Sequence, residues 1–463
     1  MTRIFGHNVP NELLLLGLVE LTIGFFVAFA SLDAMAMKAA APGSIMGFGA
    51  AAGLSISALL ISFAIGLFRP QTFLELRRVV IKTVVAALIS APVICVACYV
   101  LRFDVEQRVG GHLPDHGQVW PFDMLAAWIG LLLAIRLVFS YSLRMNMFAR
   151  RVVVLGDDLS CLRTVRAVEY QSHGLLEITA QLAPFQGSAH EAETLVQQLR
   201  RRRIWGVVMG PSGDAQAQAR LTQAAGTKLC VWDERQFWES QLRRIDIDLL
   251  TEADMTAWHS EPRTAFGRKV AAVIGRAGDI ALSLFLLILT LPLMLLTALA
   301  IKLDNPGPVF YRQERVGLGG VPFVLTKFRS MRVDAESAGP VWASKKDSRV
   351  TRVGAFMRAT RIDELPQLIC VLSGQMSFIG PRPERPHFVE KLANVIPFYH
   401  ERSRVRPGLT GWAQVNYPYG ASIEDARMKL SYDLYYARHR SLFLDVLILF
   451  STIRVILFQE GAR

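Results

Sequence analysis

Four long apolar stretches near the start of the chain restrict its fold more than any other feature. They cover residues 13–31, 45–68, 79–101 and 122–143. Each is close to the roughly 20 residues with which an α-helix crosses the hydrocarbon core of a bilayer. We therefore expect four transmembrane helices within residues 1–148. The hydrophobic share of 52% over the whole chain exceeds that of typical soluble domains and agrees with a membrane protein.

Basic residues beside these stretches predict their orientation. They are Arg69, Arg77, Arg78 and Lys82 between the second and third stretches, and Arg144, Arg150 and Arg151 after the fourth. Lys and Arg are enriched in cytoplasmic loops, so we expect both groups, and the amino terminus, on the cytoplasmic side. The net charge of +12 also raises the question of nucleic acid. No nucleic-acid-binding motif is present, so we expect no such partner.

Residues 149–262 have the pattern of a soluble α/β domain. Residues 152–156 and 206–210 read as buried strands, and residues 159–170 read as a helix. This order resembles the start of a Rossmann-type unit, but Gly156 is followed by Asp157, Asp158 and Leu159 instead of the glycine fingerprint. We expect a degenerate Rossmann-like domain with a structural or regulatory role, and dinucleotide binding is the alternative.

A fifth apolar run, residues 279–301, contains Pro292 near its middle. Basic residues flank both ends: Arg263, Arg268, Lys269 and Arg276 before it, and Lys302, Arg312 and Arg315 after it. Positive charge on both sides argues that both ends stay cytoplasmic, and a mid-helix proline can break a helix. We therefore expect a re-entrant hairpin in one leaflet, with a crossing helix as the alternative.

Adjacent carboxylates, Asp363 and Glu364, stand just before Pro366. Proline is favoured in the first turn of a helix, where unpaired backbone N–H groups attract anions. Neighbouring helical side chains point about 100° apart, so the two acids cannot duplicate each other. One could attack a substrate while the other binds metal or handles a proton. An ordinary solvated helix start is the alternative for such a pair taken alone.

Basic residues and prolines surround this pair in the sequence. Residues 301–360 contain eleven Lys or Arg against five Asp or Glu, an excess that suits ligands rich in phosphate. In Pro381-Arg382-Pro383 the two prolines fix the backbone on either side of a guanidinium, which could hold a phosphate rigidly. A rigid surface turn is the alternative for this tripeptide.

Taken together, the chain resembles the bacterial sugar transferases of the polyprenyl-phosphate hexose-1-phosphate transferase family, which are monotopic phosphoglycosyl transferases. The resemblance is strongest to the subgroup tied to exopolysaccharide assembly. The motifs that carry it occupy residues 307–317, 327–331, 347–354, 361–368, 376–384 and 405–416. The implied architecture is a membrane α-helical bundle, an α/β Rossmann-like domain, and an α/β phosphoglycosyl transferase domain at 263–463 with a re-entrant membrane helix.

The resemblance also implies roles for individual residues. Asp363 would be the nucleophile and Glu364 its partner, with Mg²⁺ held by both carboxylates. The substrate-binding set would be Lys327, Arg329, Arg358, Pro381, Arg382 and Pro383. Pro292 matches the proline that breaks the re-entrant helix. The family often has Ser-Pro there, whereas this chain has Leu291-Pro292 with Thr290 one place earlier.

The implied reaction moves a hexose 1-phosphate from a UDP-sugar to undecaprenyl phosphate and releases UMP, as the first membrane step of exopolysaccharide biosynthesis. The expected location is the bacterial inner membrane, with the catalytic domain on its cytoplasmic face and in contact with membrane lipid. A homodimer is a further hypothesis. Two alternatives stay open: a glycosyltransferase that releases UDP, and an inactive membrane scaffold for polysaccharide assembly.

Overall fold

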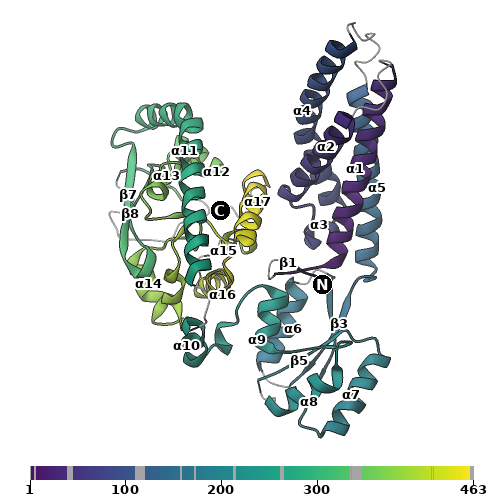
Figure 1. Cartoon of the computed structure of the whole chain (residues 1–463). Helices are drawn as coiled ribbons and strands as arrows, with labels where there is room; N and C mark the ends of the chain where they lie inside the picture. Colours follow the sequence, from purple (N-terminus) through teal and green to yellow (C-terminus); the bar gives the residue numbers. More distant parts are fainter. Residues whose placement is uncertain are drawn as a thin grey trace. The chain divides into compact units, whose positions relative to one another are not determined.

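The structure is a computed structural model that describes residues 2–4, 7–38, 45–109, 120–156, 159–171, 174–211, 215–260, 265–333, 335, 347–418, 420 and 422–458. The chain forms two compact units, Met1–Leu242 and Arg243–Arg463 (Figure 1). Each unit has its own buried cores, and each is described by itself.

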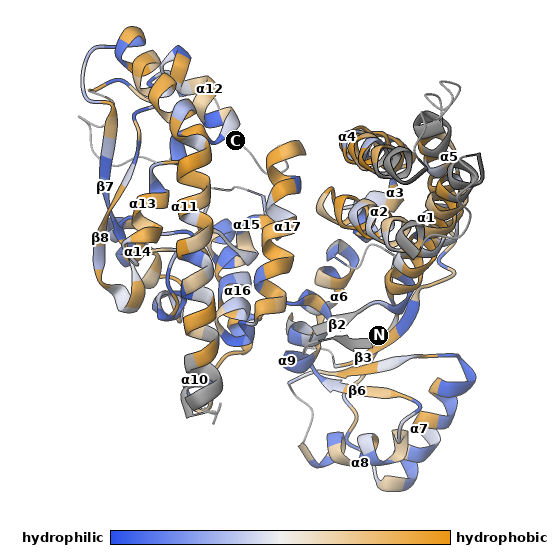
Figure 2. Ribbon diagram, turned by 45° about the horizontal axis from the view of Figure 1, so that its top comes forward, coloured by the Kyte–Doolittle hydropathy of each residue, from blue (hydrophilic) through white to orange (hydrophobic). Residues whose placement is uncertain are grey.

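Long helices dominate the start of the first unit, after a short hairpin of β1 (Thr2–Ile4) and β2 (His7–Val9). The helices are α1 (Asn11–Lys38), α2 (Ile45–Ala64), the short α3 (Pro70–Leu74), α4 (Leu76–Val109) and α5 (Trp120–Arg144). All four apolar stretches are thus helical, as predicted. Figure 2 shows hydrophobic residues along α1, α2, α4 and α5.

Four helices among the described residues are long and apolar enough to cross a membrane. Three belong to the first unit, Asn11–Leu32, Leu76–Ala97 and Leu125–Arg144, and one to the second, Ala272–Asp304. The described apolar part of α2, Phe48–Ala64, is shorter. Three of the four predicted stretches thus coincide with helices of spanning length, and whether α2, a helix of 20 residues, also crosses the membrane stays a prediction.

A buried ion pair joins the helices of the bundle. The Arg136 guanidinium on α5, which is 0% exposed, donates to both carboxylate oxygens of Glu20 on α1, at 2.7 and 2.8 Å. It also donates to Ser62 on α2 and Thr83 on α4, at 3.0 and 3.1 Å. The Arg136 side chain thereby links four helices. Glu20 and Arg136, two charged residues in this apolar region, thus have a structural role.

The second half of the first unit is a four-stranded parallel sheet with helices on both faces. Its strand order is β4 (Leu176–Leu182), β3 (Arg150–Leu155), β5 (Gly206–Met209) and β6 (Cys230–Asp233). One core lies under α7 (Ala189–Arg201) and α8 (Ala215–Ala225). The other lies under α6 (Leu159–Gln171), α9 (Glu234–Phe237) and the π-helical turn η2 (Trp238–Leu242).

Two glycines at the carboxyl ends of β3 and β5 surround a cysteine. A Cβ placed on Gly156 or on Gly210 would lie 2.5 Å from the Cys161 Sγ, and Cys161 is fully buried. In parallel sheets of this kind, nucleotides bind at the carboxyl ends of the strands, where glycines let the ligand approach. Here the space that the glycines leave is occupied by a thiol, which supports a structural role for the domain.

The second unit combines helices with two small strand pairs. Its strands are β7 (Phe310–Val316) and β8 (Pro322–Phe328), which are antiparallel, and β9 (Ser377–Ile379) and β10 (Gly408–Thr410), which are parallel. Its helices are α10 (Glu252–Ser260), α11 (Ala265–Asp304), α12 (Arg352–Thr360), α13 (Gln367–Leu372), α14 (Pro386–Ala393), α15 (Trp412–Asn416), α16 (Ile423–His439) and α17 (Leu442–Phe458).

The unit boundary differs from the one predicted. Residues 243–262 were expected at the end of the sheet domain, but the division falls between Leu242 and Arg243. The reason is packing: Ile245 and Ile247 are 2% and 3% exposed and belong to the main core of the second unit. Sequence composition does not change at this point, so it gave no signal of the boundary.

The apolar helix α11 changes direction along its length (Figure 1), and its re-entrant course in one leaflet stays a prediction. Helical structure runs from Ala265 to Asp304 through Pro292, and Figure 1 shows the ribbon change direction along its length. Leu282 and Leu286 pack on the main core, whereas Met294 and Ile301, beyond the proline, pack with a separate cluster around Phe328. A proline removes one backbone hydrogen bond and kinks a helix, which suffices for this change of direction.

Candidate active site

The two acids lie in a tight turn between α12 and α13. Arg361 ends α12 in the left-handed conformation with φ 61°, and a 3₁₀ turn, η5 (Ile362–Glu364), carries the carboxylates. Helix α13 starts at Gln367 with Pro366 as its N-cap. The predicted position just before a helix start is therefore confirmed. We expected Pro366 in the first turn of this helix, and it lies one residue before that turn, at the N-cap.

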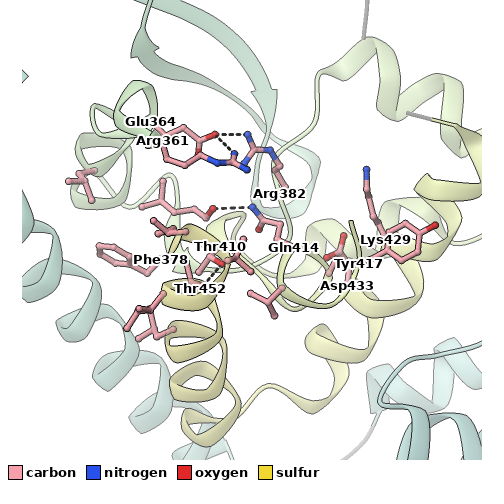
Figure 3. A pocket seen from close by; sticks show the side chains of 18 of the residues that line it. Arg361, Glu364, Phe378, Arg382, Thr410, Gln414, Tyr417, Lys429, Asp433 and Thr452 are labelled. Atoms are coloured by element: carbon pink, nitrogen blue, oxygen red, sulfur yellow. Dashed lines mark hydrogen bonds and ion pairs between the residues drawn. The ribbon is translucent and has the colours of Figure 1, made fainter. Parts of the chain in front are cut away.

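Glu364 is held between two arginines. Its Oε1 accepts a hydrogen bond from the Arg382 Nη2 at 2.7 Å, and the Arg361 Nη1 lies 3.4 Å away (Figure 3). Burial raises the pKa of this carboxyl, but the charge and hydrogen bond of Arg382, then Arg361 and Lys327, outweigh burial and lower the pKa to about 2. Glu364 is therefore a carboxylate at neutral pH.

Asp363 has a different environment from its neighbour. It is 8% exposed, and within the described part of the chain its Oδ1 has no hydrogen-bond partner. Burial, followed by repulsion from Glu364, raises the pKa of Asp363 to about 6. Two adjacent acids whose pKa values are driven apart are suited to different roles. Asp363 is therefore mostly ionised at neutral pH, and among the described residues no hydrogen bond holds its Oδ1.

Lys327 comes from the β7–β8 hairpin, and β8 packs against η5. Burial, with repulsion from Arg315, lowers the pKa of the Lys327 ammonium to about 8, and the charges of Glu364 and Asp363 oppose that shift. The acids and the lysine therefore affect one another's titration. The lysine is still mostly protonated at neutral pH.

The Pro381-Arg382-Pro383 backbone is fixed at each carbonyl. The Pro381 carbonyl accepts from the Gly408 N–H at 2.9 Å, and the Pro383 carbonyl accepts from the Arg315 Nη1 at 3.0 Å. The Arg382 carbonyl accepts from the Arg402 Nη2 at 3.0 Å. Both prolines are buried. The segment is thus rigid, as expected, and its guanidinium is aimed at Glu364.

Arg329 of the predicted substrate-binding set bonds backbone carbonyls, and Arg358 is absent from the cavity lining. Arg329 is 6% exposed and donates to the carbonyls of Pro306 and Asn305 at 3.0 and 2.5 Å, so it anchors the connection between α11 and β7. Arg358 lies in the last turn of α12 and does not line the cavity described next. These contacts give Arg329 a structural role, and a binding role for Arg358 stays a prediction.

A cavity of about 480 Å³ opens beside Glu364 (Figure 3). Its polar wall consists of Arg361, Glu364, Arg382, Glu384, Arg402, Thr410, Gln414, Tyr417, Lys429, Asp433 and Thr452. Its apolar wall includes Leu282 and Leu286 from the membrane helix α11, and Leu449, Ile453, Val455 and Ile456 from α17. Asp363 and Lys327 are not among the residues that line it. The cavity is therefore suited to a ligand with a charged group and an apolar chain.

A buried network supports the polar wall, and sequence reasoning missed it. The Arg402 guanidinium donates to the Asp433 Oδ2 and to the Tyr399 hydroxyl, both at 2.8 Å. Burial raises the pKa of Asp433 to about 6, against the effect of Arg402. The available signal was a single acid, Asp433, inside the aromatic stretch 432–436 of α16. A charge in such a stretch requires a buried partner.

Asp363 and Glu364 suit a magnesium ion that is also bound by substrate phosphates. They do not suit a metal site made of protein ligands alone. Among the described residues, no group of three or more His, Cys, Asp or Glu could hold a metal. Mg²⁺, however, is bound in phosphoryl-transfer sites by one or two carboxylates together with substrate phosphates. The unpartnered Oδ1 of Asp363 beside the Glu364 carboxylate supplies such oxygens.

Comparison with known proteins identifies the family of this chain. Residues 270–459 match the bacterial sugar transferase family model. The chain is 42% identical over 190 residues to the exopolysaccharide production protein PSS of Rhizobium leguminosarum bv. phaseoli, covering 39% of this chain and 94% of that protein. The chain therefore belongs to the bacterial sugar transferase family.

Two larger relatives carry more specific names. The chain is 46% identical over 243 residues, 52% of its length and 56% of the relative's, to a UDP-N-acetylgalactosamine-undecaprenyl-phosphate N-acetylgalactosaminephosphotransferase of Aeromonas hydrophila. It is 42% identical over 186 residues, 40% of each chain, to a UDP-glucose:undecaprenyl-phosphate glucose-1-phosphate transferase of Escherichia coli (strain K12). The similarity thus spans about half the length of these relatives.

Proposed function

We propose that this protein transfers a sugar 1-phosphate from a UDP-sugar to undecaprenyl phosphate and releases UMP. The observation that carries the proposal is the contrast between the pKa values of Asp363 and Glu364, with Glu364 and Arg382 paired in the charged wall of a cavity whose other wall is apolar. The names of the related enzymes support the same substrates.

In the first step, the Asp363 carboxylate attacks the β-phosphorus of the UDP-sugar. A bond forms between a carboxylate oxygen and phosphorus, and the bond from that phosphorus to the bridging oxygen breaks. UMP leaves with the bonding electrons, and the sugar phosphate stays on Asp363. The backbone contacts of the Pro381-Arg382-Pro383 segment hold the guanidinium of Arg382 ready to bind the phosphoryl oxygens.

In the second step, a phosphate oxygen of undecaprenyl phosphate attacks the same phosphorus, and Asp363 leaves as a free carboxylate. The product is a lipid diphosphate sugar, and the enzyme is regenerated. Mg²⁺ bound by Asp363 and Glu364 would neutralise the phosphate charge during transfer. Lys327 and Arg382 add fixed positive charge in a buried place, where it has more effect than in water.

The cavity suggests how a lipid acceptor reaches the acids. Its apolar wall is formed partly by α11, whose residues Ala272–Asp304 are apolar enough to lie in a membrane, and partly by the apolar helix α17 (Figure 2). An isoprenoid chain could lie along this wall while its phosphate meets Arg361 and Arg382. A cytoplasmic catalytic unit at the inner membrane would have access to both the soluble donor and the lipid.

Nucleotide product analysis tests the proposal. Purified full-length protein is incubated with Mg²⁺, undecaprenyl phosphate and a panel of UDP-sugars that includes UDP-glucose and UDP-N-acetylgalactosamine. We expect UMP from at least one donor with the wild type and none with Asp363→Asn. Release of UDP would indicate transfer of the sugar alone. Absence of nucleotide release from every donor would favour an inactive scaffold, and the productive donor would identify the sugar.

A further inference from the structure

Residues 243–249 form a segment, here called the strap, that lies ahead of the region matching the family model, residues 270–459. The strap packs into the second unit: Ile245 and Ile247 are nearly fully buried in the same core as Trp412 of α15 and Tyr432 of α16. Its last three residues form the 3₁₀ turn η3 (Ile247–Leu249). It is therefore a packed element of the catalytic unit and not a loose connection.

The backbone of the strap is hydrogen-bonded to both helices. The Ile245 N–H donates to the Ser431 carbonyl at 3.1 Å, and the Ser431 hydroxyl donates back to the Ile245 carbonyl. The Trp412 Nε1 donates to the Arg243 carbonyl at 2.9 Å. These bonds fix the strap to the middle of α16 and to the first residue of α15.

Charged side chains of the strap extend the contact along α16. The Arg244 Nη1 lies 3.6 Å from the Met428 Sδ, and the guanidinium lies 6.0 Å from the centre of the Tyr432 ring. Asp248 forms an ion pair with Arg427. The contacts of the strap with α16 thus run from residue 427 to residue 432.

The strap and the cavity occupy different faces of α16. Met428, Ser431 and Tyr432 are three and four residues apart, which places them on one side of a helix. Lys429 and Asp433 are four residues apart on another side, and both line the cavity. The helix therefore lies between the strap and the polar wall of the cavity.

Hydrogen bonds continue from this wall to the acids. Asp433 accepts from Arg402 at 2.8 Å, Arg402 donates to the Arg382 carbonyl at 3.0 Å, and Arg382 donates to Glu364 at 2.7 Å. We infer that the strap is a positioning element for the transfer reaction. It fixes α15 and α16, and through Asp433, Arg402 and Arg382 it holds Glu364 and the phosphate-binding guanidinium in place. This inference rests on the proposed function.

The test uses the full-length protein in nanodiscs and the variant Ile245→Ala. We expect kcat for UMP release to fall about tenfold, because small displacements of catalytic groups cost one to two orders of magnitude in rate. Ile204→Ala is the matched control, since Ile204 is 8% exposed in a core of the first unit. We expect its kcat per folded molecule to be unchanged. An equal fall in both variants would overturn the inference.

A double-mutant cycle tests the route. In an Asp433→Asn background the connection to Arg402 is already weakened, so Ile245→Ala should reduce kcat by less than in the wild type. Fully additive effects would show that the strap does not act through Asp433. Ser431→Ala removes one hydrogen bond with little loss of volume, and it replaces Ile245→Ala in the cycle if that variant does not fold.

Hydrogen exchange separates failure of the inference from failure of the proposed function. Exchange of the amides in residues 412–416 and 423–439 should rise in Ile245→Ala and stay at the wild-type rate in Ile204→Ala. This measurement does not depend on turnover. If the wild type releases no UMP, the proposed function fails while exchange still reports on the strap. Unchanged exchange in Ile245→Ala would overturn the positioning role.

Discussion

At the scale of single residues, Lys327 should make the proposed activity sensitive to alkaline pH. Burial lowers the pKa of its ammonium to about 8, so the charged form is present below that pH and is lost as pH rises through it. We expect kcat/KM, which reports groups of the free enzyme, to fall above about pH 8. A pH profile of UMP release checks this. In Lys327→Arg the guanidinium stays charged, and the falling limb should move to higher pH; the same limb in both proteins would contradict the assignment.

Asp363 should form a covalent bond with the sugar phosphate even without acceptor. With UDP-sugar and Mg²⁺ alone, the wild type should release about one UMP per active site and gain the mass of a sugar phosphate, as expected for a two-step transfer. Asp363→Asn should do neither and lose activity by more than about a thousandfold. Intact-protein mass spectrometry makes the measurement. Product formation that requires acceptor and donor together, with no enzyme adduct, would exclude the covalent mechanism.

The residues that could be predicted from sequence are those whose chemistry is local. The adjacency of Asp363 and Glu364 before a proline, and the rigidity of Pro381-Arg382-Pro383, follow from neighbouring residues alone. Arg329 belongs to a motif, but motif membership does not determine where a guanidinium points, and here it bonds two carbonyls. The Arg402–Asp433 pair joins residues 31 positions apart, a distance over which sequence pattern carries no information.

At the scale of elements, α11 is attached to both segments that carry the site. The Arg276 guanidinium donates to the carbonyls of Val371 and Leu372 at the end of α13, at 2.6 Å each. The Asp279 Oδ1 accepts from the Ser377 hydroxyl at 3.0 Å and from the Phe378 N–H at 2.9 Å, on β9. The acids precede α13 and Arg382 follows β9, so the membrane helix supports both.

Removal of the Asp279 carboxylate should loosen this attachment. Asp279→Ala leaves the buried Phe378 N–H without an acceptor, which costs about 1–3 kcal/mol of unfolding free energy. Asp279→Asn keeps one carbonyl oxygen and should lose less. Thermal unfolding in nanodiscs, with UMP release in parallel, compares the two. Equal losses in both variants would show that the negative charge, and not the acceptor, matters.

Helices and strands were predicted well where the sequence period determines the secondary structure. They were predicted less well where tertiary packing determines their course. The apolar runs gave helices, and residues 152–156 and 206–210 gave neighbouring strands of a parallel sheet. Pro292 was predicted to break its helix. Helical structure continues through Pro292, and each half of α11 packs on a different cluster; a re-entrant course in one leaflet stays a prediction. Packing partners of this kind are not encoded locally.

At the scale of the whole molecule, each of the two units has hydrophobic cores of its own. Among the described residues, the core around the candidate site is built from Ile245 onward, and the cores of the helical bundle and the sheet are built from residues before Arg243. The membrane character of the chain was evident from the sequence. The boundary at residue 242 was not, because the packing of Ile245 and Ile247 into the second core joins residues far apart in the sequence.

This division predicts that damage to the bundle leaves the chemistry intact. Arg136→Met leaves the Glu20 carboxylate buried and unpaired, and loss of one partner of a buried ion pair costs about 3–5 kcal/mol. The yield of folded protein and its thermal stability should fall, while kcat per folded molecule should not change. The double variant Arg136→Met with Glu20→Met is the control. It removes both charges and should recover much of the stability, since apolar replacements of buried pairs are often neutral. A fall in kcat that persists in the stable double variant would show instead that this ion pair contributes to the transfer reaction.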